Sequence, residues 1–309
     1  MTAIPTAQTI FDVPAPRVFS IDAGRPFLAD LASGLVDSLG TDQETLARTV
    51  ILLPTRRAAR TLGENFLHVF AAQGQRASLL PRIRAIGDID DDGLEPFFGA
   101  ADEELDLPPA ISATERLLAL ARLVAERENA FSGRKNWAAA FSAAMELSRL
   151  LESFYSEEVA FERLSQIDVG SHARHWAQSL QFLEIITQAW PLFLEEIDRC
   201  DPTYRRAKLI RAQAARWERA PPSHPIIIAG STASAPSTAY LVSVVARLKH
   251  GAAVLPGLDH TLDRRALESI EDSHPQSGLA ALLHELRFEI GEVAAWPRSG
   301  EPTPRANLL

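Results

Sequence analysis

The stretch Val50-Ile-Leu-Leu-Pro-Thr-Arg-Arg-Ala-Ala-Arg60 decides the fold that this sequence predicts. Four apolar residues before the proline are typical of a parallel strand buried on both faces, and Thr55 is placed to cap a helix that follows directly. Arg56, Arg57 and Arg60 fall in the first turns of that helix, where the macrodipole disfavours cations unless an anion lies nearby. Because ligands of open α/β sheets gather at this end of a strand, a phosphate group is the expected partner.

The basic residues of the chain are concentrated around this stretch. The whole chain has 31 Lys and Arg against 40 Asp and Glu, a formal net charge of −9, which argues against a protein coated in nucleic acid. Residues 48–84 hold seven arginines, including Arg82 and Arg84, and one acid, Glu64. This segment carries +6, and the remainder, with 24 of the 31 basic and 39 of the 40 acidic residues, carries −15. Solvated helix-face arginines are the alternative explanation for any single one of them.

Composition limits the class of protein. With 309 residues and 46% hydrophobic content, the chain is long enough to form one large domain or two smaller ones. Its single cysteine, Cys200, excludes a disulfide framework, a cysteine zinc site and a four-cysteine iron–sulfur cluster within this sequence. Residues 1–16 lack the features of a signal peptide, and no run of about 18 apolar residues occurs. We therefore expect a cytoplasmic protein with a flexible start at residues 1–16 and no membrane partner.

Strand and helix patterns alternate on both sides of a long helical stretch. Strands are expected at 17–21, 50–53, 83–86, 225–228 and 251–255, and helices at 26–39, 55–72, 236–248 and 278–290. This order predicts an α/β domain with a parallel sheet, built from residues 17–106 and 221–295. Residues 107–220 predict a large all-helical insert, with a capping box at Ser112-Ala-Thr-Glu115 and helices at 116–125, 137–154, 172–197 and 204–217. The tail, 296–309, is expected to pack against nothing and to mark a point where a longer chain is cut.

The residues of two loops indicate whether such a scaffold can hydrolyse a nucleotide. A phosphate loop needs several glycines, a lysine and a Ser or Thr for magnesium, whereas Ile21-Asp-Ala-Gly-Arg-Pro-Phe27 has one glycine, Gly24, and no lysine. Arg25 is the remaining cation there, but the proline after it lacks a backbone donor. Acids that hold magnesium are expected after the strand near residue 228, and the sequence has Ala229-Gly-Ser-Thr232 instead. The pattern favours a nucleotide-hydrolase scaffold with no catalytic residues, no metal site and, at Gly24 and Arg25, a degenerate nucleotide loop.

Other polar and aromatic groups favour structural explanations. Asp259, alone at a strand end, is typical of a turn or a helix cap. The acidic run 90–92 is typical of a solvated loop, because consecutive residues lack the alternating spacing of a calcium loop. His172 and His175 are three residues apart and have no third ligand nearby, which favours a surface or capping role. The tryptophans of the insert are expected in its core rather than as stacking platforms for bases: Trp137, Trp176, Trp190 and Trp217.

Five separated motifs, in the same order along the chain, resemble the N-terminal part of the AddB family. These proteins are the B subunits of AddAB helicase-nucleases of double-strand break repair, here of the alphaproteobacterial type. The resemblance covers roughly residues 17–296, about the first third of such a protein. The motifs are Gly24-Arg-Pro-Phe-Leu28, Ile51-Leu-Leu-Pro-Thr-Arg-Arg-Ala-Ala-Arg60, Leu79-Leu-Pro-Arg-Ile-Arg84 with Gly87-Asp88, Ile228-Ala-Gly-Ser-Thr232, and Val254-Leu-Pro-Gly-Leu-Asp259 followed by His274-Pro-Gln276.

The resemblance implies a superfamily 1 helicase-like, P-loop NTPase-like fold with a helical subdomain inserted in its first domain. It implies that a motif that touches the DNA backbone is matched by Pro54, Thr55, Arg56 and Arg57, and that Gly24 and Arg25 lie where the phosphate loop would be. Some members keep a nucleotide-binding loop, and this sequence departs from them. The family's nuclease domain and its cysteine-held iron–sulfur cluster are expected beyond residue 309, so no cofactor is expected in this chain.

The sequence leaves three functional hypotheses. The first is an inactive helicase-like module that binds and guides DNA in break repair and recombination, in a complex whose motor is an AddA-type subunit. Its expected DNA contacts are Thr55, Arg56, Arg57, Arg60, Arg82 and Arg84. The second is a protein-interaction scaffold for the motor subunit, with the arginines on an acidic partner surface. The third is a residual ATP-binding domain.

Overall fold

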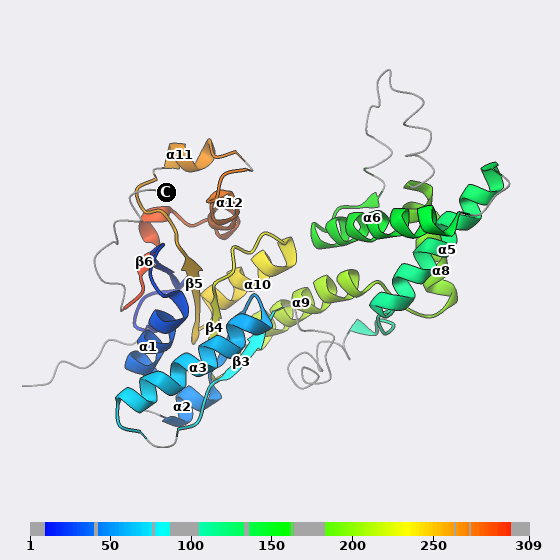
Figure 1. Cartoon of the computed structure of the whole chain (residues 1–309). Helices are drawn as coiled ribbons and strands as arrows, with labels where there is room; N and C mark the ends of the chain where they lie inside the picture. The colour runs from blue at the N-terminus through cyan, green and yellow to red at the C-terminus, as the bar shows by residue number, and fades with distance from the viewer. Residues whose placement is uncertain are drawn as a thin grey trace, which may run out of the picture. The chain divides into compact units, whose positions relative to one another are not determined.

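The computed structural model describes residues 10–39, 43–75, 78–86, 105–132, 136–161, 163, 183–262, 264–271 and 273–297. Two compact units account for them (Figure 1). Unit 1 comprises the described residues within Met1–Leu94, Arg211–Ser234 and Thr238–Leu309, and unit 2 those within Glu95–Ile210 and Ala235–Ser237. The acidic run 90–92, Gly87, Asp88, His172, His175 and Trp176 lie outside the described residues.

Unit 1 contains a six-stranded sheet in which every pairing is parallel. Its strands are β1 (Val18–Ile21), β2 (Val50–Leu53), β3 (Arg82–Ala85), β4 (Ile226–Ala229), β5 (Gly251–Pro256) and β6 (Ala294–Ala295). The spatial order is β3-β2-β4-β5-β1-β6. The expected α/β fold with a parallel sheet is therefore confirmed, and the two halves of the sheet come from segments about 140 residues apart in the sequence.

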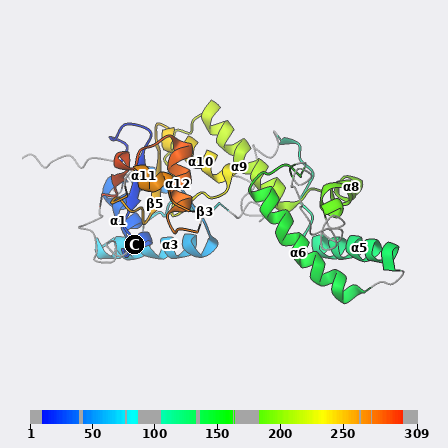
Figure 2. The same ribbon diagram turned by 90° about the horizontal axis from the view of Figure 1, so that it is seen from above.

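Helices cover both faces of this sheet. They are α1 (Phe27–Leu39), α2 (Gln43–Arg48), α3 (Arg56–Ala72), α10 (Pro236–Arg247), α11 (Arg264–Glu268) and α12 (Ser277–Leu286), with a short 3₁₀ turn, η3 (Ile290–Glu292). Connections from β1 to β2 to β3 run in one direction across the sheet, and those from β4 to β5 to β6 run in the other. Since parallel crossovers are right-handed, the two sets of helices take opposite faces. Figure 2 shows α1 and α3 on one face, with α10 and α12 on the other.

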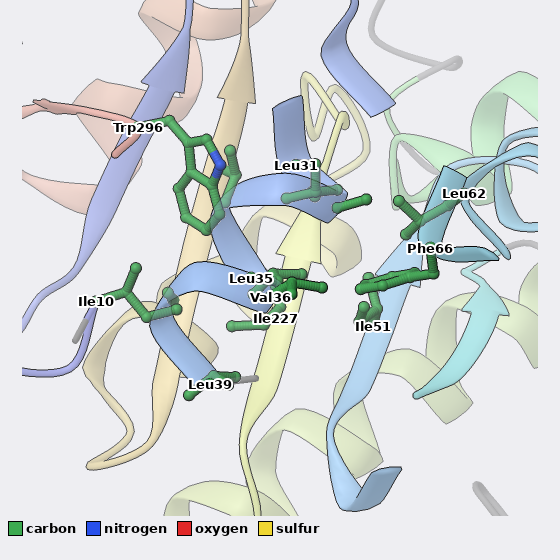
Figure 3. Close-up of a cluster of buried hydrophobic side chains, with 14 of the residues drawn as sticks. Ile10, Leu31, Leu35, Val36, Leu39, Ile51, Leu62, Phe66, Ile227 and Trp296 are labelled. Atoms are coloured by element: carbon green, nitrogen blue, oxygen red, sulfur yellow. The ribbon is translucent and has the colours of Figure 1, made fainter. Parts of the chain in front are cut away.

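The core between the sheet and helices α1 and α3 is apolar and closely packed. Ile51 and Ile227 of the sheet meet Leu35 of α1 and Phe66 of α3, and all four are fully buried (Figure 3). Trp296, directly after β6, completes this cluster with 1% of its surface exposed. Its indole N–H donates to the backbone oxygen of Asp30 at 2.9 Å, and its ring meets Phe19 edge-on at 5.4 Å.

Two expectations about the ends of the chain are wrong for the residues that the structure describes. Trp296 was expected to begin a tail that packs against nothing, yet it lies in the core and packs against α1. Ile10 lies in the segment 1–16 that was expected to be flexible, yet its side chain is 2% exposed and belongs to the same cluster. Both errors arise because single apolar side chains outside a periodic pattern give no local signal of burial.

The regular elements that the structure describes in unit 2 are helices. They are α5 (Ala113–Ser132), α6 (Trp137–Ser156), a π-helical turn, η2 (Ile185–Ala189), α8 (Trp190–Glu196) and the beginning of α9 (Pro202–Arg219), which ends in unit 1. The predicted capping box is present, because the backbone N–H of Glu115 donates to Ser112 Oγ and the Ser112 N–H donates to the Glu115 carboxylate, each at 3.2 Å. Trp190 is fully buried in the core of this unit, as predicted.

A buried ion pair joins two helices of unit 2. Arg116 of α5 is 4% exposed and donates from Nε to the carboxylate of Asp201, which precedes α9, at 2.8 Å. Arg116 also donates to Glu152 of α6 at 3.0 Å, and Asp201 accepts from the backbone N–H of Thr203 at 2.9 Å. Trp137, by contrast, is 55% exposed on α6, so the prediction that it lies in the core is wrong.

Candidate nucleic-acid interface

The arginine-bearing helix begins at the edge of the sheet where the strands end. Because all six strands are parallel, the loops after β1, β2, β4 and β5 meet at this carboxyl edge. β2 and β4 are neighbours, but β2 continues into α3 on one face and β4 continues into α10 on the other. Neighbouring strands whose connections diverge in this way mark a topological switch point, which is where open α/β sheets bind ligands.

Thr55 fixes the start of α3. Its backbone is extended, with φ −139° and ψ 153°, and its side-chain oxygen accepts a hydrogen bond from the N–H of Ala58 at 3.1 Å. The predicted cap is therefore confirmed. The remaining N–H groups of a first helical turn have no acceptor within the helix, so they and the macrodipole make this end favourable for an anion.

Three exposed arginines surround that helix start. Arg60 lies three residues after Arg57 and four after Arg56, so it shares one side of α3 with both, and all three side chains are exposed. The first turn holds no acidic residue. Within the described part of the chain, Arg57 and Arg60 form no ion pair. Each cation at a helix start is disfavoured by about 0.3–1 kcal/mol unless an anion offsets it.

The loop after β1 is a tight turn rather than a phosphate cradle. The N–H of Arg25 donates to the backbone oxygen of Asp22 at 3.3 Å, and Gly24 has φ +83°, as the third residue of a type II turn requires. The Arg25 side chain donates to the carboxylate of Asp30 at 2.5 Å, and this hydrogen bond raises the pKa of Arg25. The loop's one cation is thus already paired with an acid of the same chain.

Neighbouring loops pack closely against this turn. A Cβ atom at Gly230, after β4, would lie 3.1 Å from the ring of Phe27, and one at Gly257, after β5, would lie 3.4 Å from the Cβ of Ala23. The turn and its neighbours therefore fill space with protein atoms, and the residues present do not fit the polyphosphate of a nucleotide. The acid that magnesium would need is also replaced, since Ser231 after β4 accepts from the N–H of Ala233 at 3.0 Å and holds its own turn.

Asp259 has the structural role that the sequence favoured. Its carboxylate accepts from the backbone N–H of Thr261 at 2.9 Å and from the Thr261 hydroxyl at 2.7 Å, which forms a side-chain turn after β5. Gln276, which is 6% exposed, donates to the backbone oxygen of Gly257 at 2.9 Å and accepts from the Asp259 N–H at 3.3 Å. Sequence reasoning assigned no role to this glutamine, which links the β5 loop to the start of α12.

Arg82 and Arg84 are exposed but do not join the arginines of α3. On β3 the side chain between them, Ile83, packs into the cluster under α3, so strand alternation directs both arginines to the opposite face of the sheet. Arg84 pairs in register with Leu52, close to the carboxyl edge. Arg82 pairs with Val50 at the amino edge. The six residues expected to contact DNA therefore divide into a group at the start of α3, Arg84 at the same edge but on the opposite face of the sheet, and Arg82 at the far edge.

Among the described residues, no group of three or more His, Cys, Asp and Glu side chains is arranged to hold a metal ion. None of the described helices combines the length and the apolar character that crossing a bilayer needs. No model of a known protein family matches this sequence, and a comparison with curated proteins finds no match.

Proposed function

We propose that this chain is a helicase-like DNA-binding module of an AddAB-type helicase-nuclease, without nucleotide hydrolysis of its own, that acts in double-strand break repair and recombination. The observation that carries the proposal is the group of three exposed arginines at the capped start of α3, at the carboxyl edge where the chain leaves β2 and β4 toward opposite faces. The phosphate-binding chemistry of this edge is the part of a helicase-type site that the sequence retains. The motor of the complex would be an AddA-type subunit.

A nucleic-acid backbone suits these arginines better than a single small anion. Their guanidinium groups extend from one side of a helix over more than one turn, a span that presents several donors to successive phosphates. Contacts of this kind fix position without reading sequence, and their strength depends on counterion release. Because the chain as a whole has a net charge of −9, the locally positive arginines of α3 also orient DNA toward this edge.

The geometry of the two other loops supports a module that does not hydrolyse ATP. Arg25 is held by Asp30, and Ser231 is held in a turn, so neither is arranged to bind a triphosphate or its magnesium. Thermal unfolding with and without magnesium-ATP tests this part. We expect no stabilisation, and a stabilisation that disappears in Arg25→Ala would show that the loop binds nucleotide.

DNA binding is tested with two variants of equal charge. The first replaces Arg56, Arg57 and Arg60 by glutamine, which keeps the helix propensity and removes three positive charges. The matched control, Arg122→Gln with Arg149→Gln and Arg265→Gln, removes three exposed helical arginines elsewhere. By fluorescence anisotropy at low salt, we expect the first variant to lose at least about tenfold in affinity for duplex DNA and the control to lose little. Equal losses would reduce the effect to net charge and overturn the assignment.

An acidic protein surface is the competing ligand for the same arginines. In that case the AddA-type subunit would bind the wild-type chain and not the first variant, and duplex DNA would leave the protein complex intact. Displacement of the subunit by DNA, or retention of the subunit by the variant, would exclude this second function.

A further inference from the structure

Basic residues also line up at the opposite, amino edge of the sheet. The register pairs Arg82 with Val50, Val50 with Ile226, and Ile226 with Gly251 across four adjacent strands. Arg48 lies two residues before β2, His224 lies two residues before β4, and His250 lies directly before β5. The Ile226 N–H donates to the His250 oxygen at 2.9 Å, which fixes these two strand starts side by side.

A cavity of about 200 Å³ opens among these residues. Its polar side is formed by Arg48, His224 and His250 together with the residues that carry hydroxyl groups, Thr45 and Ser223. Pockets for drug-sized ligands measure about 300–1,000 Å³, so this one suits a smaller molecule and is too small for a duplex.

The remaining wall of the cavity is apolar. It is formed by Phe11, Leu39 and Pro225. The ring of Phe11 meets the imidazole of His250 edge-on, with centroids 5.9 Å apart. A ligand that fits both sides combines one anionic group with a small apolar or aromatic group.

The charges around the cavity favour an anion. Burial lowers the pKa of His224 below its ordinary value of 6.5, and the nearby charges of Arg82 and Arg48 lower it further. Glu44 is the acid that pairs with one of these cations within the described residues, at 2.6 Å from Arg48. Both side chains of this pair are about 70% exposed, and such pairs contribute only about 0–1 kcal/mol, so a bound anion can displace Glu44.

We propose that this cavity binds the phosphate group of a small phosphate monoester, with Arg48 and His224 as its ligands and the apolar wall against the ester group. Phosphate is preferred over a carboxylate because it offers three acceptor oxygens to the several donors that surround the cavity. The site lies at the far edge of the sheet from the arginines of α3, so its test is independent of DNA binding.

The experiment compares phenyl phosphate with inorganic phosphate by calorimetry on the full chain, at a fixed pH. We expect phenyl phosphate to bind more tightly, and we expect Arg48→Gln and His224→Gln each to weaken it by about tenfold. His68→Gln, which changes an exposed histidine of α3, is the matched control and should have no effect. Melting curves of all variants establish that they fold.

A second readout follows the protonation of His224 by nuclear magnetic resonance, with sulfate as a probe because its charge does not change between about pH 5 and pH 8. We expect sulfate to raise the pKa of His224, because the anion stabilises the imidazolium. Phenyl phosphate binding that is absent, or that survives both substitutions, would overturn the proposal. Equal affinity for the two phosphates would overturn its monoester part, and an unchanged pKa would remove His224 from the site.

Discussion

A methyl group added at Gly34 should destabilise unit 1, although alanine is the better helix former. Gly34 lies within α1, and a Cβ atom there would be 2.7 Å from Cε2 of Trp296 and closer still to Nε1. The indole has little freedom to yield. Its N–H is bound to Asp30, its backbone N–H donates to Ser20 at 2.9 Å, and its ring is fixed against Phe19.

The magnitude follows from two opposing effects. Alanine in a helix interior is favoured over glycine by about 1 kcal/mol. Overpacking a closely filled core costs about 1–3 kcal/mol, and expelling a buried tryptophan costs about as much as truncating it, about 3–5 kcal/mol. Because the clash requires the indole to leave its site, the larger cost applies, and after the gain in helix propensity we expect Gly34→Ala to lower the free energy of unfolding of unit 1 by about 2–4 kcal/mol.

Gly63 on α3 provides the matched control. A Cβ there would meet only the Cδ1 atom of Ile83, at 3.9 Å, so Gly63→Ala should stabilise the protein by up to about 1 kcal/mol. In a Trp296→Ala background, Gly34→Ala should become stabilising as well, since the clash is gone. Urea unfolding followed by circular dichroism, with hydrogen exchange of α1 amides to assign the transition, measures all three. A Gly34→Ala variant as stable as the wild type would refute the packing of Trp296 on α1.

Two further predictions concern buried and half-buried charges. Arg116→Ala should destabilise unit 2 by about 3–5 kcal/mol, because it leaves the Asp201 carboxylate buried without its partner. The control Arg122→Ala removes an exposed pair on the same helix and should cost less than about 1 kcal/mol. Denaturation monitored by hydrogen exchange of α5 measures both losses of stability, and equal losses would contradict the buried pair. The pKa of His224 is lowered in the folded state, so the unfolded chain binds more protons below about pH 6.5 and the stability of the fold should decrease as the pH drops through this value. In melting experiments at several pH values, His224→Gln should remove part of that decrease. A variant with the same pH profile as the wild type would refute the lowered pKa.

Local patterns predicted most of the sheet because parallel strands are buried on both faces. The apolar runs at β2, β4 and β5 are long enough to stand out, and proline or small residues mark where each ends. Helix starts were also predictable where a side chain forms the cap, as at Thr55 and Ser112. These signals act over a few residues, so one sequence contains them.

The features that the sequence patterns did not predict depend largely on contacts between distant parts of the chain. β6 has only two residues, Ala294 and Ala295, and it exists because it pairs with β1 about 275 residues earlier. Trp137 lies on the same helical stripe as the buried residues Ala140 and Ala144, but it is the first residue of α6 and precedes the part of the stripe that is buried. Helix α12 ends at Leu286 rather than near 290, because Arg287 adopts a left-handed conformation that periodicity does not reveal.

The candidate site was predictable in part for the same reason. The start of α3 is a local feature, so Thr55 and its three arginines were identified from spacing alone. The pairing of Arg25 with Asp30 has a local signal too, an acid in the first turn of the next helix, although the sequence pattern did not distinguish it from a phosphate contact. The separation of Arg82 from this group depends on strand register, which is set by pairing across the sheet.

The salt dependence of DNA binding tests the central claim most directly. Each phosphate contact contributes about 0.9 to the slope of log affinity against log salt for duplex DNA. Replacing Arg56, Arg57 and Arg60 by glutamine should therefore reduce the magnitude of this slope by up to about 2.7. The control variant, with glutamine at 122, 149 and 265, should keep the wild-type slope. A slope that is the same in all three proteins would contradict the assignment of the α3 arginines to a DNA backbone.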